Sequence, residues 1–246
     1  MKRIARRIVN IESYLNRIFE EKPKKSSIKR LYRGQSAPLP LKPKLFRDET
    51  LTADEIEQIE ESLLRAFRTR SPYLLPSTPS TEMDTMSLAQ HYGLPTRLLD
   101  WTANPLVALF FAVEGSHPKE PTVWIYHVGQ KQISDGLSES VNKEPRKAKS
   151  TTVIEPKRHS TRVAAQAGWH TVHRFHTVKD GQRKIWALDH INYHRDRISV
   201  IKIHPASAAA IRAELKDMGI DDGTVYGDLN SVCNAITKEL APSGMW

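Results

Sequence analysis

The sequence predicts a single α+β domain. Predicted strands and helices alternate along the 246 residues, but not in the regular strand–helix–strand order of a doubly wound parallel sheet. The composition, 39% hydrophobic and 26% charged, is that of a globular protein with a sizeable core. No apolar stretch is long enough for a membrane-spanning helix, and no apolar signal-peptide region follows the basic N-terminus. We therefore expect a cytoplasmic protein with no membrane partner.

The helices are predicted by apolar spacing and by their caps. Thr52 and Glu55 form a capping box, and Asn104 followed by Pro105 is a preferred N-cap and first helical residue. Asp228 is predicted to cap the last helix. The helices are expected at 5–20, 53–69, 85–92, 105–114, 205–218 and 229–240.

Between the helices the sequence predicts strands at 30–36, 121–128 and 197–203 and a short extended piece at 223–229. Residues 71–84 read as a loop. Residues 130–160 carry few large apolar groups, so we expect an exposed, mobile connection there, with the basic stretch 142–162 outside the core. The single cysteine, Cys233, excludes an internal disulfide and is expected to be buried.

Residues 94–105, LPTRLLDWTANP, carry more polar groups than a helix start requires. One interpretation is structural: Arg97 pairs with Asp100, and Trp101 packs on the core. The other is a pocket that gathers hydroxyl and indole donors from Thr96, Trp101 and Thr102 at the start of a buried helix. The free N–H groups of such a helix start suit phosphate or carboxylate.

Two further segments carry candidate chemistry. Arg33, in the tripeptide YRG with Tyr32, is predicted at a strand end, and its planar fork suits a phosphate. The segment 162–175 contains Gln166 and Trp169 among histidines spaced by three, a pattern that favours a basic, aromatic surface over a metal site. The net charge of +9 and a pI of about 9.6 favour an anionic partner, a nucleotide or nucleic acid.

Several motifs in this order resemble the FRG domain family, named for its Phe/Tyr-Arg-Gly motif. YRGQ at 32–35 matches the naming motif, and LAQHYGLPTRLLDWTANPLVALFFA at 88–112 is similar to the family's longest shared block. RVAAQAGWHTVH resembles a later Arg…Gln-x-Gly-aromatic motif, and IRAELKDMGIDDGTVYGDLNSV resembles the closing pattern. The resemblance implies an N-terminal helical extension at 1–27 and an FRG domain at 28–246.

FRG domains occur in bacteria and phages, often near defence or toxin functions, and their motif order is similar to that of ADP-ribosyltransferases. The resemblance implies an ADP-ribosyltransferase-like fold with a split, mainly antiparallel sheet flanked by helices. It also implies that NAD is the substrate, that Arg33 holds its phosphates or ribose, and that Thr102 takes the Ser/Thr position. The late glutamate position falls at Gln166, which can hydrogen-bond a hydroxyl but is no carboxylate base. Another acid, such as Asp100, would then be needed.

Three functions therefore remain open. The first is an NAD-binding, ADP-ribosyltransferase-like enzyme or toxin, with a possible protein target. The second is a non-catalytic module that binds nucleic acid or a nucleotide. The third is a toxin-like nuclease with His91 or a later histidine as acid or base. For the first, the cleft would be lined by Arg33, His91, Thr96, Arg97, Asp100, Trp101 and Thr102.

Overall fold

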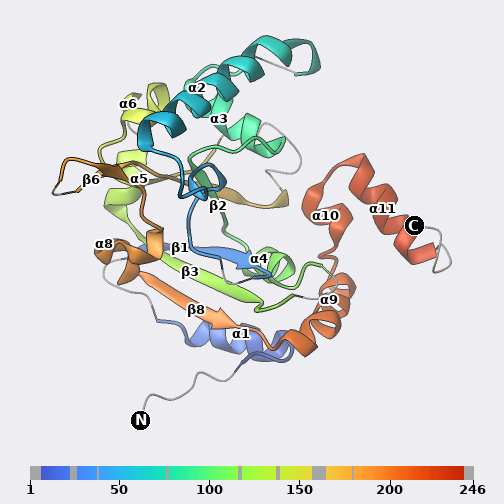
Figure 1. The fold of residues 1–246 in the computed structure, drawn as a ribbon. Coiled ribbons are helices and arrows are strands. Elements are labelled where there is room, and N and C mark those ends of the chain that lie inside the picture. Colours follow the sequence, from blue (N-terminus) through green and yellow to red (C-terminus); the bar gives the residue numbers. More distant parts are fainter. Residues whose placement is uncertain are drawn as a thin grey trace.

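The computed structural model describes residues 7–22, 27–37, 39–75, 78–115, 118–136, 139–156, 165–178 and 180–240. The predicted fold class is confirmed, because one mainly antiparallel sheet is flanked by helices (Figure 1). Within the described residues, no helix is long and apolar enough to cross a membrane.

The main sheet has six strands in the order β4-β5-β2-β1-β3-β8, and all its neighbouring strands are antiparallel. The strands are β1 (Ser27–Gln35), β2 (Leu98–Thr102), β3 (Thr122–Gly129), β4 (Thr152–Ile154), β5 (Gly168–Val172) and β8 (Ile198–Lys202). A separate hairpin joins β6 (His176–Thr177) to β7 (Arg183–Lys184).

The sheet is split between β1 and β2. These strands share one register pair, Tyr32 with Thr102, whereas β1 and β3 share eight. The sheet therefore consists of two halves, β4-β5-β2 and β1-β3-β8, that separate beyond this pair. Groups on β1 and β2 beyond the pair are free to serve a site instead of the ladder.

Helices cover both halves of the sheet (Figure 1). A core cluster joins α1, α4 and α9 to β1, β3 and β8, and a second cluster joins α2 and α3 to β2 and β5. In Figure 1, α10 and α11 lie beside α9, away from the sheet. The helices are α1 (Ile11–Glu20), α2 (Ala53–Arg70), α3 (Glu82–His91), α4 (Pro105–Ala112), α5 (Gln130–Gly136), α6 (Glu139–Lys143), α8 (Asn192–Arg195), α9 (Ala208–Asp217), α10 (Asp222–Tyr226) and α11 (Leu229–Leu240).

Helix α4 packs directly on the backbone of β1. A Cβ built on Gly34 would lie 1.8 Å from the carbonyl oxygen of Ala108 and 2.6 Å from the nitrogen of Ala112. Only a glycine leaves room for this approach. The glycine of the YRG tripeptide thus serves helix–strand packing, and this packing fixes the position of the neighbouring Arg33.

The predicted caps are confirmed. The side chain of Thr52 accepts from the N–H of Glu55, whose carboxylate accepts in return from the N–H of Thr52. Asn104 accepts from the N–H of Leu106, and Pro105 is the first helical residue. Since caps satisfy local N–H groups with nearby side chains, they are readable from local sequence.

Three element predictions are wrong. Residues 98–102, expected within a crossover, form the inner strand β2. Residues 82–84, expected in a loop, begin α3, which is capped by Thr81. Residues 222–226, expected to be extended, form the helix α10 because Asp221 and Thr224 make a capping box.

The prediction of an exposed connection outside the core at 130–160 is wrong for the described residues 130–136 and 139–156, which contain α5, α6 and β4. Val153 and Ile154 are buried and pair with β5. Arg146 is held by ion pairs to Glu61 and Glu82. Basic residues here serve tertiary contacts, which composition alone does not reveal. Residues 157–162 of the predicted basic stretch lie outside the described residues.

The burial predicted for Cys233 is also wrong, since the side chain is exposed. Its helix α11 packs mainly on α10. The apolar spacing that predicted this helix was correct, but much of its surface faces solvent, including Leu229 at 77% and Ile236 at 51% exposure.

Candidate functional site

A small cavity of about 80 Å³ lies between α3, β2 and β5. Its lining combines the polar face of α3 with residues of the two strands: Ser87, Gln90, His91, Asp100, Trp101, Pro156, Gln166, Gly168, Trp169 and His170. Three larger hollows, of about 440 Å³ beside α9, about 690 Å³ beside the β6–β7 hairpin and about 200 Å³ beside the C-terminal end of α2, contain none of the predicted site residues. The cavity beside α3 is therefore the candidate site.

A chain of polar contacts runs along one wall of this cavity. The amide nitrogen of Gln90 donates to Oδ1 of Asp100, and the amide oxygen of Gln90 accepts from the hydroxyl of Thr96. Oδ1 of Asp100 also lies 3.0 Å from Nδ1 of His170. Nε2 of the same ring lies 3.0 Å from the hydroxyl oxygen of Ser87. The chain thus links a strand carboxylate to a helix hydroxyl through one imidazole.

Asp100 is the charged group of the site. Burial by surrounding protein would raise the pKa of its carboxyl. The contact with His170, the charge of Arg33 and the hydrogen bond from Gln90 outweigh that effect, so the pKa lies below its ordinary value. The carboxylate is therefore ionised at neutral pH. Its side chain is 60% exposed, so the negative charge lies at the mouth of the cavity.

Arg33 reaches the same region from β1 across the split in the sheet. Its Nη1 donates to the backbone oxygen of Asp100 at 2.6 Å. Its Nε is buried and finds no hydrogen-bond partner in the described part of the chain. Burial lowers the pKa of the guanidinium below its ordinary value, an effect that Asp100 partly opposes. The group still carries its charge at neutral pH and retains a free donor.

Gln166 lies just before β5, on the opposite side of β2 from Arg33. Its backbone oxygen accepts from the hydroxyl of Thr102. The next residue, Ala167, has a positive φ of 45°, a conformation that non-glycine residues rarely adopt and that often accompanies function. Gln166 belongs to the lining of the cavity, and its side-chain nitrogen is buried and, among the described residues, has no partner.

The structure brings some of the predicted site residues together and leaves others apart. Asp100, Trp101, His91 and Gln166 line the cavity, and Arg33 contacts Asp100. The hydroxyl of Thr102 bridges the backbone between Gln166 and Asn104, and it does not line the cavity.

Tyr32 and Trp101 are both core residues. Tyr32 packs into the cluster beneath α4, on the other side of the split from the cavity. Trp101 is 3% exposed, and its indole N–H donates to Thr171. Of these two residues, only Trp101 therefore also lines the cavity.

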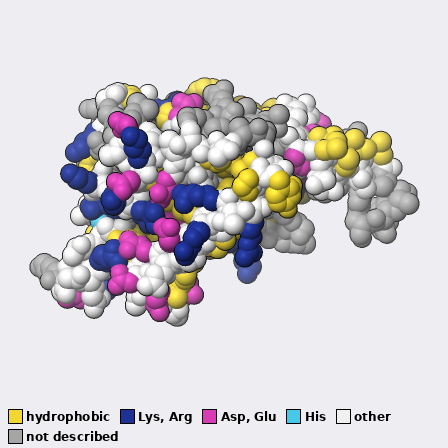
Figure 2. Space-filling view, turned by 90° about the horizontal axis from the view of Figure 1, so that it is seen from above, with side chains coloured by type: hydrophobic (Ala, Val, Ile, Leu, Met, Phe, Trp, Pro, Cys, Tyr) yellow, Lys and Arg dark blue, Asp and Glu magenta, His cyan; other side chains and the backbone are white. Residues whose placement is uncertain are grey.

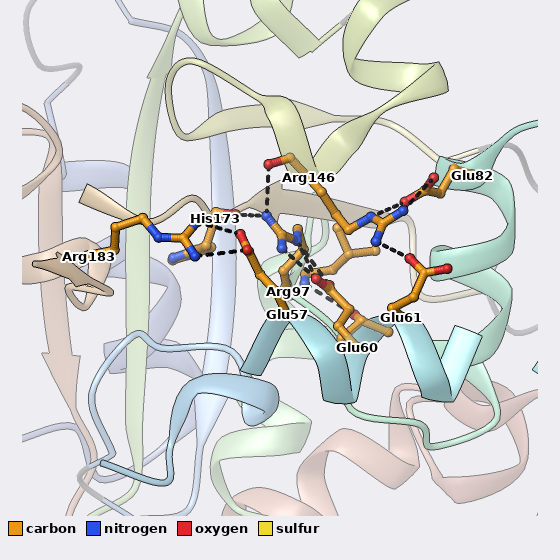
Figure 3. A network of polar contacts seen from close by, with 10 residues as sticks. Glu57, Glu60, Glu61, Glu82, Arg97, Arg146, His173 and Arg183 are labelled. Carbon is orange, nitrogen blue, oxygen red and sulfur yellow. Dashed lines mark hydrogen bonds and ion pairs between the residues drawn. The ribbon is translucent and has the colours of Figure 1, made fainter. Parts of the chain in front are cut away.

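Arg97 takes a structural position instead of a place at the cavity. Its guanidinium is fully buried and pairs with Glu60 of α2, with Nε 2.9 Å from Oε1 (Figure 3). Further donors reach the backbone oxygens of Arg146 and His173. The expected pairing of Arg97 with Asp100 is not formed, because the two side chains leave opposite faces of the same region of β2.

The histidines after β5 do not gather around a metal position. His173 is buried beside Thr171, and burial lowers its pKa to about 3. His176 stacks on Trp186 with ring centroids 5.0 Å apart. Within the part of the chain that the structure describes, no three side chains of metal-binding type lie together.

Sequence reasoning missed Ser87, Gln90 and Glu60. The first two lie three positions apart on a helix that was predicted from apolar spacing, so they share one face. A polar face at 87, 90 and 91 on a helix packed in the core was the available signal. Glu60 gave no local signal, because its partner Arg97 lies 37 positions later.

With this geometry in view, the chain matches the FRG domain family model over residues 28–121. The chain therefore carries an FRG domain, as its motifs predicted. The match covers β1, β2, α3 and α4 but ends before β3, so the later motifs that resemble the family lie beyond it. No curated protein and no solved structure gives a significant match.

Proposed function

We propose that this FRG domain binds a nucleotide, NAD first among them, at the cavity beside α3 and acts as an ADP-ribosyltransferase-like enzyme. One observation carries the proposal. The three motif regions that the resemblance assigns to NAD lie on neighbouring strands: Arg33 on β1, Asp100 and Thr102 on β2, and Gln166 at the start of β5. The first and the last of these regions, at Arg33 and Gln166, are 133 positions apart in sequence.

Two buried donors on the motif residues have no partner within the described residues. They are Nε of Arg33, which contacts β2 at Asp100, and the amide nitrogen of Gln166 in the cavity lining. A buried donor without a partner costs about 1–3 kcal/mol, so a ligand that brings acceptor atoms to these donors would gain binding energy from them. Arginine suits a phosphate, and a glutamine amide suits a ribose hydroxyl or a carboxamide oxygen. Both are groups of NAD.

The cavity itself has the dimensions of one small ring, about 80 Å³, with Trp101 and Trp169 in its wall. NAD supplies a nicotinamide ring of this kind, joined to ribose through a bond that releases the ring when it breaks. Asp100 holds a negative charge at the mouth, where it favours a neighbouring cation. It is the carboxylate available where the late glutamate of ADP-ribosyltransferases is replaced by Gln166.

Ligand-dependent melting tests the proposal. NAD should raise the melting temperature of the wild-type chain, because a ligand that binds only the folded state stabilises it. Asp100→Asn and Gln166→Ala should remove the shift while they leave the melting temperature of the free protein nearly unchanged. Arg65→Lys, on the exposed face of α2, is a control that should retain the full shift. No shift at millimolar NAD in the wild type would refute NAD as the ligand.

A nucleic-acid partner remains the alternative, and it rests on the net charge of +9. The face that carries α2 mixes basic and acidic side chains (Figure 2), and several of them pair, such as Arg183 with Asp54 and Glu57. Retention on RNA or DNA that falls steeply with salt would favour this alternative. Cleavage of the RNA would favour a nuclease.

A further inference from the structure

Ser87, His170 and Asp100 lie in the order of an activated serine. The hydroxyl oxygen of Ser87 is 3.0 Å from Nε2 of His170, and the other ring nitrogen, Nδ1, is 3.0 Å from Oδ1 of Asp100. The N–H at Nδ1 is poorly aligned with the carboxylate. Asp100 is the more exposed partner, with 60% of its side chain accessible, so its carboxylate has room to turn toward this N–H. The serine and the carboxylate thus lie at opposite nitrogens of the imidazole, which is the arrangement that nucleophilic catalysis by a serine requires.

The protonation of the Ser87–His170–Asp100 contacts follows from the charge of Asp100. Asp100 is ionised and only accepts, so the facing Nδ1 of His170 carries the hydrogen in the neutral ring. Nε2 then holds a lone pair toward Ser87. The serine hydroxyl therefore donates to the imidazole, and its proton has an acceptor in place. A carboxylate in contact with the ring also stabilises the positive charge that develops when the ring takes that proton.

The serine faces the cavity. Ser87 and His170 both belong to the lining, although they are only 7% and 8% exposed overall. The lining contains no lysine or arginine among the described residues, so it suits a neutral group better than an anionic one. Gln166 contributes an amide nitrogen without a described partner, a donor of the kind that stabilises a developing oxyanion.

We infer that Ser87 is a nucleophile that takes up an acyl group from a small neutral ester, with His170 as its base and Asp100 as a positioning residue. In the first step the serine oxygen bonds to the carbonyl carbon, its proton passes to Nε2, and the carbonyl electron pair moves to oxygen. When that pair returns, the bond to the leaving oxygen breaks, and this oxygen takes the proton from His170. Water then releases the acid from the acyl-serine by the same sequence. This activity goes beyond the proposed function and shares with it only the cavity.

The experiment uses two probes on the full chain. A fluorophosphonate reacts with activated serines: the serine oxygen bonds to phosphorus, fluoride leaves, and peptide mass spectrometry locates the adduct. p-Nitrophenyl acetate reports ester hydrolysis. The wild type should be labelled at Ser87, and a chain unfolded in urea before the probe is added should not be labelled.

Ser87→Ala should abolish both signals, and Asp100→Asn should slow both by about 100-fold or more, because the ring loses the carboxylate that orients it and stabilises its positive charge. Asp100 is largely exposed, so this variant should melt with the wild type. His170→Gln removes the base directly, and if that chain does not fold, Asp100→Asn still tests the inference. Ser231→Ala, on α11, is a control that should react like the wild type. Absence of the label, or a label at another residue, overturns the inference. A label at Ser87 in a chain that NAD does not stabilise supports the inference and refutes the proposed function.

Discussion

Removal of the carboxylate of Glu60 should destabilise the fold more than loss of any exposed charge. The Arg97–Glu60 pair is buried on both sides, with side-chain exposures of 0% and 1%. Three N–H···O contacts join the two groups (Figure 3). Three charge-assisted bonds at about 1.5–3 kcal/mol each set an upper limit of about 9 kcal/mol. Arg97 keeps contacts to the backbone oxygens of Arg146 and His173, so the loss should be smaller. We expect Glu60→Ala to cost about 3–5 kcal/mol, as for a buried charge left alone.

Urea unfolding and thermal melting measure this cost. For a chain of this size the loss corresponds to a melting temperature lower by about 6–20 °C. Glu57→Ala, three residues earlier on α2, breaks a part-exposed pair with Arg183 and should cost less than about 1 kcal/mol. Replacing Glu60 and Arg97 together by Leu and Met should recover most of the loss. A Glu60→Ala chain within about 1 kcal/mol of the wild type would refute the buried-pair account.

Three more perturbations test other parts of the structure. Gly34→Ala should cost about 1–3 kcal/mol of stability or more and so lower the melting temperature markedly, because its Cβ would meet the oxygen of Ala108; unchanged melting would show that α4 can move away from β1. Burial lowers the pKa of His173 to about 3 and of His194 to about 4, below the value of about 6.5 in an unfolded chain. The unfolded state therefore binds more protons below pH 6.5, and stability should fall from there toward pH 4 by about 3 kcal/mol per histidine. His194→Gln should flatten the pH dependence of the urea midpoint, and an equal slope in both proteins would contradict this. Arg33→Lys should fold normally yet weaken NAD binding by about 1–3 kcal/mol in a calorimetric titration, because a point charge cannot replace a two-bond fork; equal affinity would remove Arg33 from the site.

The parts of the fold that local chemistry decides were predictable. Thr52 and Asn104 cap helices with groups two or three residues away, and the period of the apolar residues located the helices between the caps. Strand β2 was missed because it is buried on both faces and pairs with a strand 70 positions later. Its five residues therefore show no simple alternation of apolar and polar side chains.

The site was predictable only in part, for a similar reason. Motif residues Arg33, Asp100 and Gln166 drew attention because their chemistry is unusual for their local setting. Their assembly depends on strand order, which the sequence leaves open. Ser87 and Glu60 belong to helices whose pattern is satisfied by packing alone, so their polar roles appear only once their partners are placed.

The split sheet has a consequence for how the chain can be divided. The family match ends at residue 121, one position before β3, which supplies eight of the register pairs of β1. A fragment cut at that match would leave both edges of β1 nearly bare, and bare edges invite pairing between molecules. It would also lack β5, and with it one wall of the cavity. Near the N-terminus, Ile8 pairs with Ile203 in a parallel bridge, through backbone hydrogen bonds to Lys202 and from His204. A recombinant fragment meant to carry the cavity therefore has to run from about Ile8 to beyond Ile203, more than twice the length of the segment that the family shares.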